Sequence, residues 1–145
     1  MNLTEIESIL AYYRKDLAIK LVKGKKNSLQ LPVLEKIENG ENYNLPSLMA
    51  YIKAIGMDLS VNDVVISNTE ELGAFLKKER EFCGQTLADV RSENNRGNRE
   101  TNKLEAGGGS RNNLLKYLEK LNKKIDFKLI DKYGIAKEKE SEKNN

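Results

Sequence analysis

The sequence contains no histidine and no tryptophan, and among its 145 residues there is a single cysteine, Cys83. The absence of histidine removes the usual general base and the commonest metal ligand. One cysteine cannot form an intramolecular disulfide. Neither a phosphate-binding glycine loop followed by Lys-Ser/Thr nor a nucleophile paired with a base is found in the sequence. We therefore expect no enzymatic activity, no metal and no cofactor.

Long apolar runs are absent as well. No stretch approaches the roughly 20 residues that a helix needs to cross a bilayer, and no apolar run follows the N-terminus. Together with the low cysteine content, this predicts a reduced, cytoplasmic setting and no membrane partner. Hydrophobic residues nevertheless make up 39% of the chain, so we expect it to fold.

The two halves of the chain repeat each other at a spacing of about 66 residues. A short motif in the first half, Lys36-Ile37-Glu38-Asn39-Gly40, recurs in the second half as Lys103-Leu104-Glu105-Ala106-Gly107. The apolar positions that follow also correspond: Leu48, Tyr51, Ile52, Ile55 and Leu59 match Leu114, Tyr117, Leu118, Leu121 and Ile125. Upstream, Ile6, Ile9, Leu10 and Arg14 align with Leu72, Phe75, Leu76 and Arg80. Such a duplication predicts one small fold used twice, in domains 1–66 and 67–133. Residues 134–145 are nearly all polar and are expected to be a disordered tail.

Apolar periodicity and cap residues predict the same elements in each half. In the first half we expect a helix from Leu3 through Leu21 with Thr4 as its cap and Glu7 completing a capping box, a short helix from Pro32 to Asn39-Gly40, a helix from Leu45 to Gly56, and a β-like stretch over 59–65. In the second half we expect a helix capped by Thr69, a helix capped by Thr86 and Asp89, a short segment ending at Gly107, a helix over 114–121 and a strand over 125–130. Terminal strands of this kind can pair, which would make the chain a monomeric pseudo-dimer or a homodimer.

The excess positive charge lies in the second half. Residues 1–66 carry eight Lys and Arg against eight Asp and Glu, whereas residues 67–133 carry fourteen against eleven. If one half binds a polyanion, this distribution favours the second.

The second half resembles the lambda-repressor-like, Cro/XRE-type helix-turn-helix family over residues 70–125. The resemblance rests on an arginine at the end of the first helix, on a Thr-x-x-x-Val pattern in the second helix, and on a Leu-Glu-x-Gly ending of the third: Arg80, Gln85-Thr86-Leu87-Ala88-Asp89-Val90 and Leu104-Glu105-Ala106-Gly107. In the first half it extends from Ser28 to Leu59. The resemblance implies a mainly α fold of two tandem lambda-repressor-like helix-turn-helix units, with a short β-strand expected at the end of each.

Both halves depart from the family pattern. In the second, Arg91 and Arg96 stand where the family has small or aliphatic residues, and Thr101 replaces another aliphatic. Two arginines cannot be buried unpaired, so we expect this helix pair to be splayed, exposed or ordered by a ligand. The first half keeps an apolar core on its third helix, but its outward positions, Leu31, Pro32 and Val33, are apolar too.

The resemblance implies a sequence-specific DNA-binding transcriptional regulator, a repressor or autoregulator, that inserts a recognition helix into the major groove of double-stranded DNA. Its base-contacting residues would be Arg, Asn and Lys near the start of the third helix, and its phosphate-contacting residues would flank the second helix and the glycine turn. These candidate DNA-binding residues are Gln85, Thr86, Arg96, Asn98, Arg99, Asn102, Lys103 and Arg111.

Two alternatives remain open at this point. A segment as polar as residues 91–103 would have the same composition if it were only a solvated loop. The neutral first half with its apolar tip favours instead a protein-binding module, such as a phage- or plasmid-encoded inhibitor or an antitoxin, whose protein partner contacts the first repeat.

Overall fold

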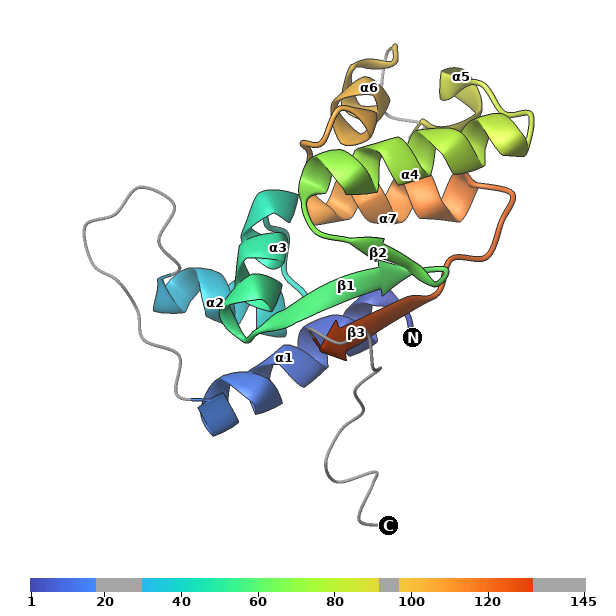
Figure 1. Ribbon diagram of the computed structural model, residues 1–145. Helices are drawn as coiled ribbons and strands as arrows, with labels where there is room; N and C mark the ends of the chain where they lie inside the picture. The colour runs from blue at the N-terminus through green and yellow to red at the C-terminus, as the bar shows by residue number, and fades with distance from the viewer. Residues whose placement is uncertain (18–29, 92–96, 132–145) are drawn as a thin grey trace.

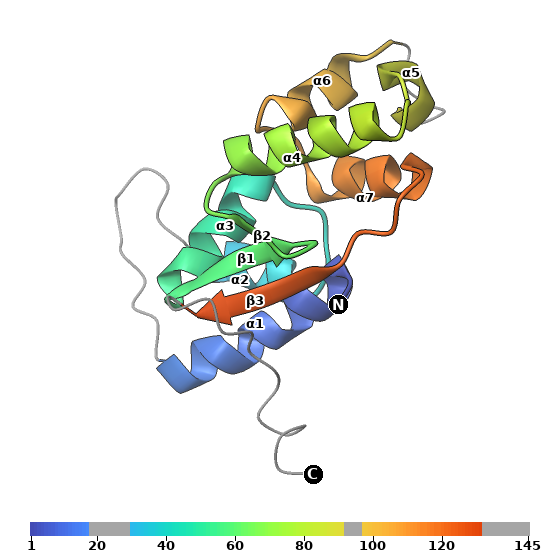
Figure 2. The same cartoon turned by 45° about the vertical axis from the view of Figure 1, so that its right-hand side comes forward.

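The computed structural model describes residues 1–17, 30–91 and 97–131. Within these ranges the chain forms seven helices and one three-stranded antiparallel sheet, so the prediction of a mainly helical fold is confirmed. The first half contains α1 (Leu3–Leu17), α2 (Leu31–Glu38), α3 (Leu45–Ala54), β1 (Met57–Val61) and β2 (Val64–Ile66). The second half contains α4 (Thr69–Phe82), α5 (Leu87–Val90), α6 (Arg99–Glu105), α7 (Arg111–Lys120) and β3 (Phe127–Asp131). In both views the sheet lies between α1 and the group formed by α4 to α7 (Figure 1 and Figure 2).

Helices α2 and α6 occupy equivalent places in the two halves and end in the same way. At the end of α2 the Glu41 N–H donates to the Lys36 carbonyl at 2.9 Å, and at the end of α6 the Gly108 N–H donates to the Lys103 carbonyl at 2.8 Å. Each ending needs a residue with positive φ, which is supplied by Gly40 and Gly107. The repeated glycine of the two motifs is thus the glycine of a helix C-cap.

The predicted helix starts are correct for some helices and wrong for others. Thr86 caps α5 in a capping box with Asp89, as expected. The cap of α1 is Asn2 rather than Thr4, because the Asn2 side chain accepts the Glu5 N–H at 2.8 Å. Likewise Asn68, and not Thr69, caps α4. Both errors arise because two residues with capping propensity lie close together in the sequence, and only one of the two occupies the N-cap position.

The β-like stretch of the first half is a hairpin. Strands β1 and β2 pair antiparallel with Val61 opposite Val64, and the two residues between them, Asn62 and Asp63, both have positive φ. This is the backbone of a type I′ turn, which matches the twist of the strands.

Strand β3 joins the two halves. It pairs antiparallel with β1, with Leu59 opposite Leu129, so the sheet order is β2-β1-β3. The strand begins at Phe127, and the alignment of Ile125 with Leu59 is therefore wrong. The connection from α7 to β3 is longer than the one from α3 to β1, which moves the strand along the sequence.

A second contact between the halves relates equivalent residues to each other. Asn44 and Ser110, about 66 residues apart, form an isolated antiparallel bridge. On its two sides the Leu45 N–H donates to the Gly109 carbonyl at 3.0 Å, and the Arg111 N–H donates to the Tyr43 carbonyl at 2.9 Å. Such reciprocal pairing is typical of a two-fold interface, here formed within one chain.

One hydrophobic core extends through both halves. Its most deeply buried members come from all seven described helices and the sheet, and include Ile6, Leu10, Ile37, Tyr51, Ile52, Val61, Leu76, Val90, Leu104 and Tyr117. The junction expected between the domains falls between β2 and α4. The division into two domains remains a prediction. The continuation of the first helix to Leu21, the lysines at 23, 25 and 26, and the tail 134–145 lie outside the described residues.

Candidate nucleic-acid interface

Helix α6 carries three of the candidate residues on one exposed surface. Arg99, Asn102 and Lys103 are all exposed. On the opposite side of the same helix, Thr101 and Leu104 are only 2% exposed and face the core. The helix thus presents two cations and an amide to solvent, and we call these three side chains the α6 outer face.

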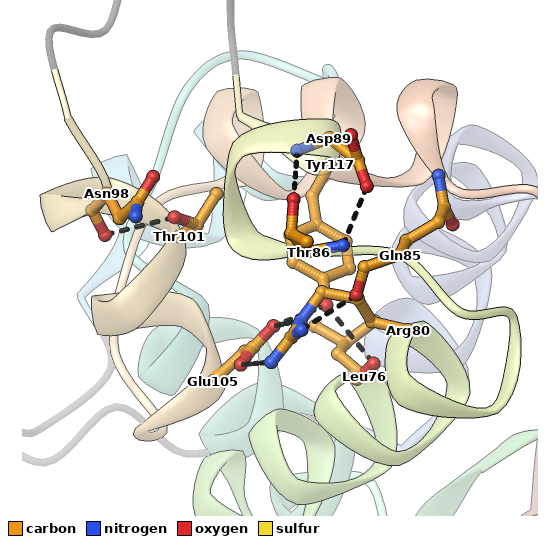
Figure 3. A network of polar contacts seen from close by, with 9 residues as sticks. All are labelled: Leu76, Arg80, Gln85, Thr86, Asp89, Asn98, Thr101, Glu105 and Tyr117. Carbon is orange, nitrogen blue, oxygen red and sulfur yellow. Dashed lines mark hydrogen bonds and ion pairs between the residues drawn. The ribbon is translucent and has the colours of Figure 1, made fainter.

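A buried network holds α6 against α4 and α7 (Figure 3). The Arg80 guanidinium donates to both oxygens of Glu105, from Nε at 2.7 Å and from Nη2 at 3.0 Å. The Tyr117 hydroxyl lies 2.6 Å from Glu105 Oε2 and 3.1 Å from the Leu76 carbonyl. Because Glu105 is the last residue of α6, this network fixes the end of that helix relative to its two neighbours.

The same network has an electrostatic consequence. Hydrogen bonding to Glu105 raises the pKa of the Arg80 guanidinium, and burial followed by the bond to Glu105 raises the pKa of the Tyr117 hydroxyl. Tyr117 therefore stays protonated and remains a hydrogen-bond donor. An equivalent set lies in the first half, where Arg14 donates to Glu38 at 2.6 Å and Tyr51 donates to Glu38 and to the Leu10 carbonyl.

Helix α6 also approaches α4 closely at a glycine. A Cβ atom added at Gly73 would lie 2.5 Å from the Glu105 carbonyl oxygen and 2.6 Å from that of Leu104. Only glycine permits this backbone contact. The repeat does not predict this close contact at Gly73, because the equivalent residue of the first half is Glu7, which has a large side chain.

Thr101, which replaces an aliphatic residue of the family pattern, is accommodated in the core. Its hydroxyl donates to the Asn98 carbonyl at 2.9 Å (Figure 3), so the buried polar group is satisfied within its own helix turn. Asn98 itself is half-buried at the start of α6. The other acidic residue of this helix besides Glu105 is Glu100, which is half-buried and accepts a hydrogen bond from Asn113 at 2.9 Å.

Gln85 and Thr86 already have partners within the chain. The Gln85 side chain donates to the Lys120 carbonyl and accepts from the Asn122 N–H, each at 2.9 Å, and so ties the start of α5 to the end of α7. The Thr86 N–H donates to Asp89 Oδ2 at 2.7 Å. That backbone hydrogen bond lowers the pKa of Asp89. The Asp89 carboxylate therefore lies directly beside Thr86. A phosphate bound at Thr86 would therefore lie close to a carboxylate, and like charges repel.

Arg111 lies between the two halves rather than on the outer surface. Its Nε donates to Glu7 Oε2 at 2.7 Å, and the Tyr43 hydroxyl donates to the same oxygen at 2.5 Å. The Arg111 side chain is 12% exposed and that of Glu7 is 1% exposed. Since its charge is neutralised by a buried carboxylate, Arg111 is structural in this conformation. It is not brought together with the α6 outer face.

The remaining arginines divide between the described and the undescribed residues. Arg91 is half-exposed directly after α5, a helix of one turn, so its charge is not buried. Arg96 lies outside the described residues.

The sequence analysis did not identify Glu7, Glu105, Arg80 and Tyr117 as residues that hold helices together, although three of them belong to the repeated positions. The signal was present: an arginine, a glutamate and a tyrosine recur together in both halves, at spacings that differ by one residue. For Glu7 no local signal exists, because its cationic partner is more than one hundred residues away.

Within the three described ranges, no helix combines the length and the apolar character needed to span a membrane. Nor do those ranges bring three or more Cys, Asp or Glu side chains into a group able to hold a metal ion. Comparison of the chain with protein-family models, with curated proteins and with solved structures finds no match.

Proposed function

We propose that the chain consists of two tandem helix-turn-helix units of the Cro/XRE type and that the second unit binds double-stranded DNA in a sequence-specific manner. In this proposal the protein is a transcriptional repressor or autoregulator without enzymatic activity or cofactor. The observation that carries the proposal is the α6 outer face, on which Arg99, Asn102 and Lys103 are exposed together.

The chemistry of these three residues suits the major groove. Arginine donates two hydrogen bonds to the O6 and N7 atoms of guanine, and asparagine pairs in the same bidentate way with adenine. Lysine contacts phosphate or guanine and supplies affinity through counterion release. A protein seated there would repress transcription by occluding the site from other proteins.

The framework behind α6 supports the proposal. A recognition helix has to present its side chains at fixed positions, because direct base contacts depend on distance and angle. Glu105 at the end of α6 is held by Arg80 and Tyr117, and the backbone of α6 rests against Gly73. The outer face is thus carried by a helix whose inner side is fully engaged.

The structure divides the candidate residues into three groups. Arg99, Asn102 and Lys103 form the proposed contact surface, with Asn98 half-buried beside them. Gln85, Thr86 and Arg111 have internal partners and are not part of this proposed contact surface. Arg96 stays a sequence-based expectation.

The proposal is tested by fluorescence anisotropy with random duplex DNA and with duplex DNA from the region upstream of the coding sequence. We expect binding that the Arg99→Ala, Lys103→Ala double variant loses. A matched control, Lys53→Ala, Lys78→Ala, removes the same charge from exposed positions on α3 and α4 and should retain binding. Absence of binding by the folded wild-type protein at low salt would refute the proposal, and equal losses in both double variants would refute the assignment of the surface.

A second candidate function is favoured by one observation in the first half. Leu31 at the start of α2 is 42% exposed, and Pro32 beside it is exposed as well. Exposed apolar residues on a short helix suit a protein partner better than phosphate. If the protein binds no DNA, a Leu31→Ser variant compared with the wild type in affinity capture is the corresponding test, and the protein-partner function requires that a captured protein be lost with this variant.

A further inference from the structure

The two halves of the chain form the kind of contact that normally joins two copies of a protein. The bridge between Asn44 and Ser110 pairs equivalent residues, and its flanking hydrogen bonds are reciprocal. Strands β1 and β3, which follow α3 and α7 in the two halves, also pair antiparallel. The ion pair between Glu7 and Arg111 lies in the same interface. The self-complementary contact of a dimer is therefore already made within one chain.

The sheet leaves little edge for a second copy. Its edge at β3 is five residues long, and the N–H of Phe127 on that strand already donates to the Met1 carbonyl at 2.8 Å. Its other edge, at β2, is three residues long. The N–H of Ser67, the next residue, is occupied by Glu71 Oε2 at 2.9 Å. Short edges whose backbone groups are partly occupied are a common protection against pairing between chains.

Helices α2 and α6 are equivalent in position but differ in surface chemistry. The lysine of the repeated motif is exposed in both, as Lys36 on α2 and Lys103 on α6. At the two other exposed positions of the α6 outer face the first half has Pro32 in place of Arg99 and Glu35 in place of Asn102, and both replacements are exposed. The exposed surface of α2 therefore carries one acid and one base, whereas the α6 outer face carries two bases and no acid.

This difference decides which helix suits DNA. Glu35 would place a carboxylate near the phosphates, where like charges repel, and proline offers no side-chain donor to a base edge. A chain with two equivalent helices, only one of which has the required donors and charge, is suited to one groove contact and not to two.

We propose that one chain binds DNA as a monomer through α6 alone, at a single non-palindromic site whose base contacts lie within about one helical turn, ~10 base pairs. In this view, the first unit packs against the second in the place that a second copy of the protein would occupy in a dimer. It makes no base contact through α2. The inference rests on the proposed function of the second unit.

The equivalent lysines allow a matched test. Lys103→Ala and Lys36→Ala remove the same exposed side chain from the same place in the two units. With duplex DNA from the region upstream of the coding sequence, we expect Lys103→Ala to weaken binding on the order of tenfold at low salt and to lower the slope of log affinity against log salt by about one. Lys36→Ala should leave both quantities unchanged. Equal effects of the two substitutions would overturn the inference while leaving DNA binding itself intact.

The stoichiometry and the footprint complete the experiment. Sedimentation of the full chain with a target duplex should give one 16.5 kDa protein per duplex, and hydroxyl-radical cleavage should show one protected stretch. Two chains per duplex, or two protected stretches related by a dyad, would overturn the inference. Absence of any binding by the wild type would refute the proposed function and this inference together, so the two failures are distinguishable.

Discussion

Glu7 on α1 and Arg111 at the start of α7 form an ion pair that joins the two halves of the chain, with Arg111 Nε 2.7 Å from Glu7 Oε2. The carboxylate is almost completely buried and accepts a second hydrogen bond from Tyr43. Removing one partner of a buried pair leaves a charge without compensation, which is far more costly than losing an exposed pair.

We expect Arg111→Met to lower the free energy of unfolding by about 3 kcal/mol, since Glu7 would remain buried without its cation. Urea denaturation followed by circular dichroism measures this loss. The control is Lys128→Met, which breaks the exposed pair between Lys128 and Asp63 and should cost less than about 1 kcal/mol. Equal losses in the two variants would contradict a structural role for Arg111.

The Arg-Glu-Tyr networks of the two halves should contribute similar stability. Tyr51→Phe and Tyr117→Phe each remove a hydroxyl that donates to a buried glutamate and a backbone carbonyl. We expect each substitution to cost about 1–2 kcal/mol, because the buried acceptors lose a partner. Chemical denaturation of the two single variants checks this, and a loss in only one of them would show that the repeated geometry is not energetically equivalent.

Alkaline pH should destabilise the protein through its buried tyrosines. Burial is the main cause that raises the pKa of Tyr43, Tyr51 and Tyr117, and a neighbouring glutamate adds to it in each case. In the unfolded chain a tyrosine ionises near pH 10. The stability that these groups contribute is therefore complete below about pH 10 and is lost as the pH rises above it, because only the unfolded state releases the protons.

A spectrophotometric titration tests this pH dependence. The tyrosinate absorbance of the three buried residues should rise only in the pH range where the circular dichroism signal of the folded protein is lost. Full ionisation of all tyrosines while the fold persists would contradict the burial of these hydroxyls.

Gly73→Ala should destabilise the protein although alanine favours helices. In an unconstrained helix the substitution gains up to about 1 kcal/mol. Here the added Cβ would lie 2.5 Å from the Glu105 carbonyl, so α6 has to move, at a cost of about 1–3 kcal/mol. Thermal unfolding shows whether Gly73→Ala raises or lowers the stability of the protein.

The control is the neighbouring Ala74→Gly, at an exposed position of α4. It should also lower the stability by about 1 kcal/mol but leave DNA affinity unchanged, whereas Gly73→Ala should reduce DNA affinity.

Local sequence signals predict many of the helix starts and ends. Pro32 and Pro46 lie in the first turns of α2 and α3, and Gly40 and Gly107 end α2 and α6. These residues fix φ or permit positive φ, so a sequence pattern locates the helix ends. The type I′ hairpin was predicted only as a β-like stretch, although Asn62 and Asp63 between β-branched residues are a local turn signal.

Long-range features could not be found in this way. Glu7 resembles any acidic residue in the first turns of a helix, and only the distant Arg111 explains its burial. Strand β3 was misaligned because Ile125 continues the apolar alternation of Phe127 and Leu129, yet it precedes the strand. Of the candidate residues at the start of the third helix, Arg99, Asn102 and Lys103 are exposed, whereas Asn98 is half-buried. Gln85 and Arg111 have partners that no spacing in the sequence indicates.

The most direct test of DNA binding by α6 is the affinity of the full chain for its target duplex over a range of salt concentrations, measured beside the Arg99→Ala, Lys103→Ala variant. About four to six phosphate contacts would make the wild-type affinity fall by a few powers of ten for a tenfold rise in salt, and the variant should bind more weakly with a slope smaller by about one to two. Salt-independent binding, or equal affinity and slope for the two proteins, would contradict the account.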